Sequence, residues 1–296
     1  MATLHQEAKT AWRELGFTPS RARGQNFLVH RRVIDTILQL LDLVHDDRVL
    51  EVGPGLGFVT RCLVGEGRNV WAIEVDPLLV RWLRDGPLGS CPGFHLVHGD
   101  VLTTDFDRLL PEDGVKVVAN LPYSVAAPAL LRLFEAGRHF SVVVVMLQKE
   151  VAHRLAAQPG SSAYGGLSVW CRLYGRITRK VAVSPEAFTP RPRVDSTLLR
   201  IELHREPMVA RDEVPLLRAV VRAGFSRRRK MLGNALAGLF EARAGAVFEQ
   251  AGIDPRRRAE TLELEEFARL ARAYGEVAGG KGGPGPGGSG GSAGVA

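Results

Sequence analysis

Residues 51–57, with the sequence Glu-Val-Gly-Pro-Gly-Leu-Gly, constrain the fold of this chain more than any other segment. They continue an apolar run at 48–51 and precede a helical pattern that starts near Phe58. A strand, a glycine turn and a helix in this order are the layout of a nucleotide-binding βα unit, because glycines let the backbone turn sharply and approach a ligand. A tight structural turn explains the same glycines about as well, so the segments that follow must decide between the two.

The spacing of these glycines favours a ligand that has no phosphates. A dinucleotide site has the pattern G-x-G-x-x-G, and Phe58 occupies the position at which a third small residue is needed. A ligand held by backbone and ribose contacts fits this loop better than a pyrophosphate does. A dehydrogenase is disfavoured for this reason, and also because no suitable His or Tyr pair for hydride transfer is evident.

Apolar runs of strand length alternate with helical patterns over the first half of the chain. The expected strands cover 48–52, 69–74, 94–98, 115–119 and 141–147. The expected helices cover 31–43, 57–65, 127–136 and 149–157. This alternation predicts an α/β fold of the Rossmann-like class, with a mostly parallel twisted sheet and helices on both faces.

Polar or glycine positions stand at the carboxyl ends of four predicted strands, namely Gly53, Glu74, Asp100 and Asn120. Because the carboxyl ends of parallel strands meet at one edge of a sheet, these positions predict a ligand site there. Glu74 follows the glycine loop at the distance, about 20 residues, at which nucleotide-binding folds place an acid that binds ribose hydroxyls. A solvated carboxylate at a strand end is the weaker alternative.

The sequence Asn-Leu-Pro-Tyr at 120–123 suits chemistry on an adenine amine. This amine is a poor nucleophile because its lone pair is delocalised, and acceptors for its hydrogens help the nitrogen to become tetrahedral. The Asn120 side-chain oxygen and the Leu121 carbonyl can accept, Pro122 fixes the turn, and Tyr123 offers a face for stacking. With a methyl sulfonium as electrophile, catalysis is mostly positioning and desolvation. A base in a duplex is out of reach of such a pocket, so the target must be flipped or unpaired. In isolation, a strand-end turn with a packed Tyr explains these residues better.

Two further segments have two interpretations each. Phe188, in a proline-stiffened loop at 188–193, can supply a second stacking face, or it can simply anchor the loop. Residues 24–28, Gly-Gln-Asn-Phe-Leu, are either a segment folded over a pocket or a plain helix entry.

The composition limits the class of protein and its partners. A net charge of +7 and a pI of about 9.7 favour a polyanionic partner. The scattered cysteines Cys62, Cys91 and Cys171 never form C-x-x-C, which indicates reduced thiols, no disulfide framework and no metal site. No run approaches the roughly 18 apolar residues of a membrane span, and no apolar signal core is present. We therefore expect a cytoplasmic protein without a membrane contact.

The pattern along the chain predicts four parts. Residues 1–23 are polar and basic, and we expect a flexible segment. Residues 24–206 contain the predicted sheet and end with a basic strand pair around 172–183 and 194–204. Residues 207–275 are helical and rich in arginine, which predicts a small α-helical domain. Residues 276–296 are rich in glycine and cannot form a core, so we expect them to be disordered.

With these motifs the chain resembles the bacterial small-subunit rRNA adenine dimethyltransferases, the KsgA/RsmA family of the class I S-adenosylmethionine-dependent methyltransferases. The resemblance extends from about Gly24 to Tyr274. Besides the segments at 24–28, 51–57 and 120–123, it is carried by Leu-Gln-Lys-Glu-Val-Ala at 147–152 and by residues 188–196, 225–234 and 253–260.

The resemblance implies a cofactor, a substrate and their contacts. S-adenosylmethionine would be the cofactor, with Asp100 at its adenine amino group and Glu74 at its ribose. The expected cofactor contacts as a set are Asn26, Leu28, Gly53, Glu74, Asp100 and Asn120. The reaction would place two methyl groups on N6 of each of two adjacent adenosines in the 3′-terminal hairpin loop of 16S rRNA. The substrate would be the immature 30S subunit during ribosome biogenesis, and the enzyme a monomer.

Two features of the chain depart from the family pattern. Ser124 stands where many members have Asn, which can reshape the edge of the target pocket, and the glycine-rich tail lies outside the pattern. The small domain also carries basic residues that would position the RNA through its phosphates, although a solvated helix face explains them as well. These residues are Arg222 and, just downstream, the run Arg227, Arg228, Arg229 and Lys230, which we expect to open a helix.

Other functions remain as alternatives to the expected one. The nearest is a 23S rRNA adenine N6-methyltransferase that confers macrolide resistance, which the sequence at 148–150 and the basic segment at 225–260 disfavour. A non-catalytic RNA-binding assembly factor is disfavoured by the intact Asn120 to Tyr123 segment and by Glu74. A small-molecule methyltransferase would leave the basic helical domain without a purpose.

Overall fold

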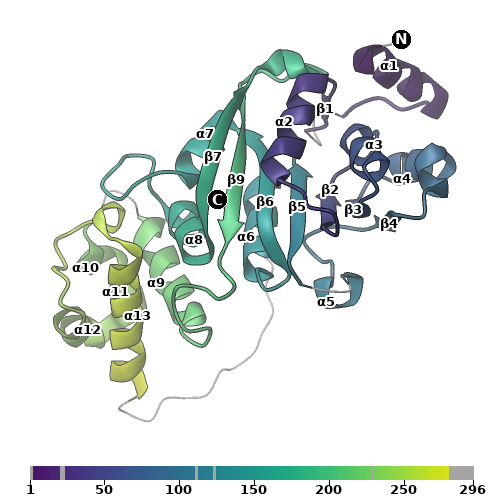
Figure 1. The fold of residues 1–296 in the computed structure, drawn as a ribbon. Coiled ribbons are helices and arrows are strands. Elements are labelled where there is room, and N and C mark those ends of the chain that lie inside the picture. Colours follow the sequence, from purple (N-terminus) through teal and green to yellow (C-terminus); the bar gives the residue numbers. More distant parts are fainter. Residues whose placement is uncertain (1–2, 21–23, 111–112, 123–124, 228–229, 280–296) are drawn as a thin grey trace. The chain divides into compact units, whose positions relative to one another are not determined.

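The computed structural model describes residues 3–20, 24–110, 113–122, 125–227 and 230–279 (Figure 1). The chain divides into two units. The first consists of Met1–Ala152 and Gly175–Arg205, and the second of His153–Tyr174 and Glu206–Ala296. The expected boundary at 206/207 differs from this division in one respect, because the sequence analysis placed 153–174 with the sheet.

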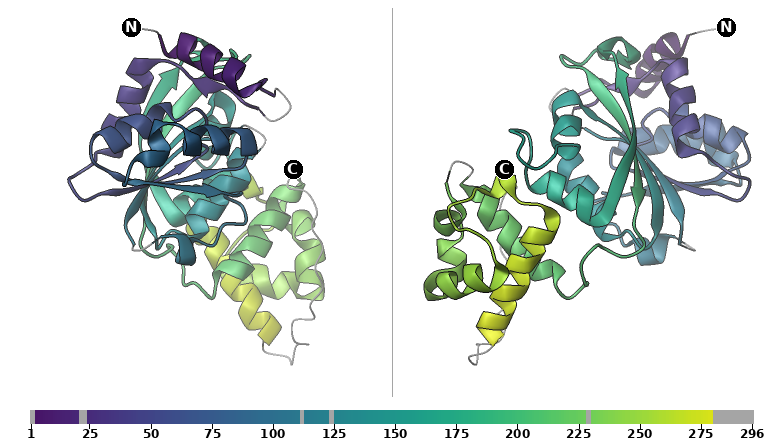
Figure 2. Two further views of the ribbon diagram at one scale, coloured as in Figure 1. Left: turned by 90° about the vertical axis from the view of Figure 1, so that its right-hand side faces the viewer. Right: turned by 60° about the vertical axis from the view of Figure 1, so that its left-hand side comes forward.

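The first unit is built around a seven-stranded sheet, which Figure 2 shows from two further sides. The strand order of this sheet is β4-β3-β2-β5-β6-β9-β7. Its parallel strands are β2 (Arg48–Val52), β3 (Asn69–Glu74), β4 (Phe94–His98), β5 (Val115–Asn120) and β6 (Phe140–Gln148). Strands β9 (Ser196–Leu203) and β7 (Gly175–Val183) continue the sheet in antiparallel pairing. This mostly parallel sheet confirms the predicted α/β fold.

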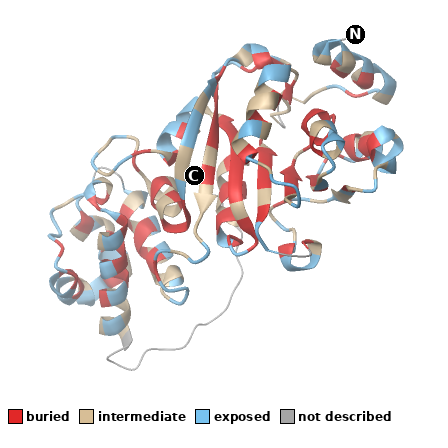
Figure 3. Ribbon diagram, viewed as in Figure 1, coloured by how far each residue is buried: buried red, intermediate tan, exposed pale blue. Residues whose placement is uncertain are grey.

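Helices flank the sheet, and the central strands are buried along most of their length (Figure 3). Such strands need long apolar runs because both of their faces are covered. Helix α2 (Arg31–Leu41) packs against β5, β6 and β9. Helix α3 (Phe58–Gly65) packs against β3, and α4 (Pro77–Asp85) packs against β3 and β4. The other short elements are η1 (Pro87–Ser90), α5 (Phe106–Leu109), α6 (Ala126–Glu135), α7 (Lys149–Leu155) and η2 (Pro185–Ala187).

The N-terminal segment is folded, so the expectation of a flexible segment over 1–23 is wrong for helix α1 (Leu4–Leu15). The Thr3 side chain accepts the Gln6 N–H in a capping box, and Gly16 ends the helix at φ 60°. Ala8 and Ala11 are buried. The apolar residues of this helix, Leu4, Ala8, Ala11, Trp12 and Leu15, recur at helical spacing, a signal that was not used when a flexible segment was predicted.

A two-stranded sheet lies beside the large one. It joins β1 (Phe27–Leu28) to β8 (Phe188–Thr189) in antiparallel register, with Leu28 opposite Phe188. Residues 24–28, named here the strap, are therefore not a plain helix entry, because α2 begins only at Arg31. The pairing ties the strap to a segment that lies far away in the sequence.

The second unit is helical. Helix α8 (Gly166–Tyr174) packs against α9 (Val214–Ser226) and α13 (Leu264–Gly279), which explains why 153–174 belongs to this unit. The strand expected around 172–183 accordingly begins at Gly175, because residues 172–174 are still part of α8, whose buried side contacts other helices. The remaining elements are α10 (Leu232–Ala235), α11 (Ala237–Phe240), η3 (Glu241–Arg243), α12 (Ala244–Ala251) and η4 (Ala259–Thr261). The prediction of a disordered tail over 276–296 is wrong for residues 276–279, which continue α13, and the tail from 280 onward lies outside the described residues.

Candidate active site

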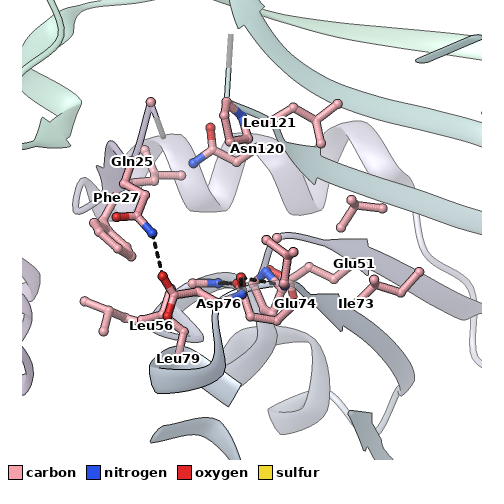
Figure 4. A pocket seen from close by; sticks show the side chains of 18 of the residues that line it. Gln25, Phe27, Glu51, Leu56, Ile73, Glu74, Asp76, Leu79, Asn120 and Leu121 are labelled. Carbon is pink, nitrogen blue, oxygen red and sulfur yellow. Dashed lines mark hydrogen bonds between the residues drawn. The ribbon is translucent and has the colours of Figure 1, made fainter. Parts of the chain in front are cut away.

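A cavity of about 420 Å³ lies at the carboxyl ends of β2, β3, β4 and β5. Its wall includes every residue that the sequence analysis expected to contact a cofactor: Asn26, Leu28, Gly53, Glu74, Asp100 and Asn120. Figure 4 shows Glu74 and Asn120 on opposite sides of this cavity. The sheet edge thus brings together side chains that are far apart in the sequence, as the topology of parallel strands requires.

The glycine loop after β2 needs glycine for steric reasons. Gly57 has a φ of 80°, and a Cβ added there would lie 2.7 Å from a methyl carbon of Leu88. A Cβ on Gly55 would lie 3.1 Å from the ring of Phe27 in the strap. The loop therefore approaches both the packed helix layer and the strap, and the glycines serve packing as well as access to the cavity.

Glu74, at the end of β3, is held in place by backbone amides. Its Oε2 accepts from Gly55 N at 3.1 Å, and its Oε1 accepts from Val75 N and Asp76 N, both at 2.9 Å. Burial raises the pKa of this carboxyl above its ordinary value, and the three N–H groups oppose that shift. Because each carboxylate oxygen has two lone pairs, Glu74 can accept further hydrogen bonds from a ligand.

Glu51 also lines the cavity, and the sequence analysis did not name it as a site residue. Its side chain is buried at the end of β2 and accepts from the Thr60 hydroxyl at 2.7 Å. Burial raises the pKa of Glu51 to about 7, and the nearby charge of Glu74 acts in the same direction. The sequence signal that could have identified Glu51 as a site residue is its position, since it is an acid in a mostly apolar strand that ends at the glycine loop.

Asn120 ends β5 and faces the cavity. Its Nδ2 donates to the backbone oxygen of Asn26 at 3.4 Å, so the side-chain oxygen points away from that contact. Leu121 and Pro122 also line the cavity. The predicted stacking residue Tyr123, and Ser124 beside it, lie outside the described residues.

Phe188 and the strap close another part of the wall. Phe188 is buried in β8, lines the cavity and pairs with Leu28. The strap is therefore a segment folded over a pocket, which was one of its two interpretations. Stacking of Phe188 on a target base remains a prediction.

The basic run at 227–230 was expected to open a helix, but Arg227 follows the end of α9 at Ser226, and α10 begins only at Leu232. Arg222, Arg227 and Lys230 are exposed, whereas Arg228 and Arg229 lie outside the described residues.

Within the described ranges, no cluster of His, Cys, Asp and Glu is arranged to hold a metal ion. No helix in the described part of the chain has both the length and the apolar character needed to cross a membrane. Cys62, Cys91 and Cys171 are free thiols.

Sequence comparison places this chain among known RNA-modifying enzymes. A family described as "Ribosomal RNA adenine dimethylase" matches residues 17–276. Ribosomal RNA small subunit methyltransferase A of Geobacter metallireducens is 42% identical over 271 residues, covering 89% of this chain and 98% of that protein. The protein of the same name from Clostridium perfringens is 40% identical over 272 residues, covering 90% and 94%.

Two solved structures share the fold over most of the chain. A dimethyladenosine transferase from Plasmodium falciparum superposes with a TM-score of 0.71 at 23% identity, covering 84% of this chain and 97% of that one. The 23S rRNA methyltransferase ErmE superposes with a TM-score of 0.61 at 26% identity, covering 84% and 100%.

Proposed function

This chain belongs to the ribosomal RNA adenine dimethylase family, and from this premise we propose that it dimethylates N6 of two adjacent adenosines in the 3′-terminal hairpin loop of 16S rRNA, with S-adenosylmethionine as methyl donor. Family membership confirms the resemblance expected from the sequence. The observation that carries the proposal is that Glu74, Asp100 and Asn120 line the same cavity at the carboxyl edge of the sheet.

The wall of the cavity suits an adenosine cofactor. Glu74 would accept from the ribose hydroxyls, and Asp100 would accept from the adenine amino group. The side chain of Asp100 is oriented by Leu102 N, which donates to Oδ1 at 2.9 Å. Val75 is 63% exposed although it lines the cavity, and Val101 lines it too. These two apolar side chains, each next to one of the acids, would cover an adenine ring.

The remaining wall suits the target adenine. The cofactor, when bound, would supply an electrophilic methyl group on a sulfonium. Asn120 would accept a hydrogen of the N6 amine through its side-chain oxygen, and the Leu121 carbonyl would accept the other. Phe188 would stack on the base. Because methyl transfer would leave a cationic methylated ammonium, which is acidic enough to lose its proton to solvent, the chain needs no strong base, and its residues act by positioning and desolvation.

The substrate would be the immature 30S subunit, bound by a monomer in the cytoplasm. The chain has a net charge of +7, which suits a polyanionic surface. The exposed Arg222, Arg227 and Lys230 would contact phosphates and so position the hairpin without reading its sequence. Arg228 and Arg229 would extend the same basic run.

Arg227→Glu is expected to weaken binding to the small subunit and to lower the slope of log affinity against log salt by about one. The reason is that each phosphate contact releases condensed cations. The measurement is subunit binding at several salt concentrations. Arg81→Glu is the matched control, since Arg81 is exposed on α4. Equal slopes for wild type and Arg227→Glu would show that Arg227 belongs to a solvated surface only.

Binding of the cationic cofactor is expected to strengthen as the pH rises from 6 to 8 and to release protons near pH 7. The free protein holds Glu51 with a pKa of about 7, and a bound cation favours the ionised carboxylate, so its pKa falls on binding. Glu51→Gln should flatten this pH dependence. Calorimetry in buffers of different ionisation enthalpy measures the effect, with the uncharged thioether product as the comparison ligand. Identical pH profiles for wild type and Glu51→Gln would refute the role of Glu51.

Methyl transfer from tritiated S-adenosylmethionine tests the proposed function. The two substrates are small subunits from a strain that lacks the modification and protein-free 23S rRNA. We expect label in the 16S rRNA alone. Label in the 23S rRNA would instead assign the chain to the resistance enzymes, and binding without label would favour a non-catalytic assembly factor.

A further inference from the structure

Gln25 of the strap connects two sides of the cavity. Its Nε2 donates to Asp76 Oδ2 at 3.1 Å, and Figure 4 shows this contact across the mouth of the pocket. Its Oε1 accepts from Ser20 N at 2.8 Å. Because Ser20 N–H occupies the oxygen, the nitrogen is the end of the side chain that faces Asp76. Both ends of Gln25 are thus used by the protein.

Asp76 carries this connection to the predicted ribose-binding acid. Its side chain is 4% exposed, and Oδ1 accepts from Leu78 N at 3.0 Å as the cap of α4. The backbone N of Asp76 donates to Glu74 Oε1 at 2.9 Å. A displacement of Asp76 would therefore move both the start of α4 and the backbone N–H that orients the Glu74 carboxylate.

The rest of the strap is anchored on the opposite side of the cavity. Leu28 pairs with Phe188, and the Asn26 oxygen accepts from Asn120 Nδ2 at 3.4 Å. The ring of Phe27 packs against those of Trp12 and Phe17, with centroids 5.6 and 5.9 Å away. Helix α1 and the segment after it thus support the strap from outside. The Gln25–Asp76 bond ties the strap to the side of Glu74, where the ring of Phe27 also lies close to Gly55.

We propose that Gln25 is a positioning residue that holds the strap across the cofactor pocket through its hydrogen bond to Asp76. This inference rests on the proposed function for the identity of the cofactor. Without the bond, the strap keeps its anchors at Asn120 and β8 but is held less firmly on the side of Glu74. Cofactor affinity then falls, whereas the transfer step, which depends on Asn120 at the end of β5, is retained.

Exchanging the polarity of the pair tests this role. Gln25→Glu places a carboxylate against the Asp76 carboxylate. Asp76→Asn keeps an oxygen for Leu78 N but presents an amide nitrogen to the Gln25 nitrogen. Each single variant is expected to raise the Kd and the KM for S-adenosylmethionine about tenfold, with kcat at saturating cofactor within about threefold of wild type. The double variant Gln25→Glu with Asp76→Asn restores one donor and one acceptor, and should return Kd to within about threefold of wild type.

Controls separate positioning from folding and from the proposed function. Gln39→Glu adds the same charge on the exposed side of α2 and should bind cofactor like wild type. Gln25→Ala removes the bond without adding charge and should weaken binding in the same direction. The inference is overturned if the single variants bind like wild type, or if the double variant is no better than the singles. Failure of the wild-type protein to bind S-adenosylmethionine would overturn the proposed function, and this inference with it.

Discussion

Asn120→Ala is expected to lower the rate of methyl transfer by about a hundredfold or more, while affinity for the small subunit stays within about twofold of wild type. The alanine removes an acceptor that is fixed before the substrate arrives, because Asn120 ends β5 and is held by its Nδ2 contact to Asn26. Since the adenine amine is a poor nucleophile, an acceptor for its hydrogens acts mainly in the transition state. Single-turnover transfer to small subunits measures this effect without product release.

Asn69→Ala is the matched control for this experiment, because Asn69 is an exposed asparagine at the start of β3, whereas the cavity lies at the end of that strand. Its rate should equal that of wild type. Asn120→Asp keeps an acceptor but loses the donor to Asn26, so its rate should lie between those of wild type and Asn120→Ala. An unchanged rate for Asn120→Ala would remove Asn120 from the catalytic site.

Glu74→Ala is expected to raise the Kd for S-adenosylmethionine about a hundredfold. Two losses combine in this variant. The ribose hydroxyls lose a charged acceptor, and the N–H groups of Gly55, Val75 and Asp76 lose the carboxylate that orders the loops around it. Calorimetric titration with the cofactor measures the change directly.

Glu74→Gln separates the two losses, because it keeps the shape and one acceptor oxygen, and it should bind more weakly than wild type but better than Glu74→Ala. Glu66→Ala, at an exposed position after α3, should leave the affinity unchanged. Equal affinities for wild type and Glu74→Ala would exclude Glu74 from the cofactor site.

The sheet and the edge that carries the site could be predicted from local sequence. Strands such as β2, β3 and β4 have the predicted bounds, because buried parallel strands are continuous apolar runs. The convergence of Glu74, Asp100 and Asn120 followed from the parallel topology, since it needed only the order of strands and the direction of their carboxyl ends.

The parts that were missed depend on contacts between distant residues. Helix α1 has a local amphipathic pattern, but its stability also depends on packing of Ala8 and Ala11 in the core and on the ion pair between Glu7 and Arg61, which lie 54 positions apart. The Gln25–Asp76 bond joins residues 51 positions apart. The raised pKa of Glu51 arises from burial, which depends on the complete tertiary structure.

The most direct measurement is the identity and position of methylated nucleosides in 16S rRNA after incubation of undermethylated small subunits with the enzyme and S-adenosylmethionine. Mass spectrometry of the 3′-terminal fragment resolves both. The proposed function predicts N6,N6-dimethyladenosine at two adjacent positions of the hairpin loop, and none when the enzyme carries Asn120→Ala. Unmodified adenosines with the wild-type enzyme, or methylation at another nucleotide, would contradict it.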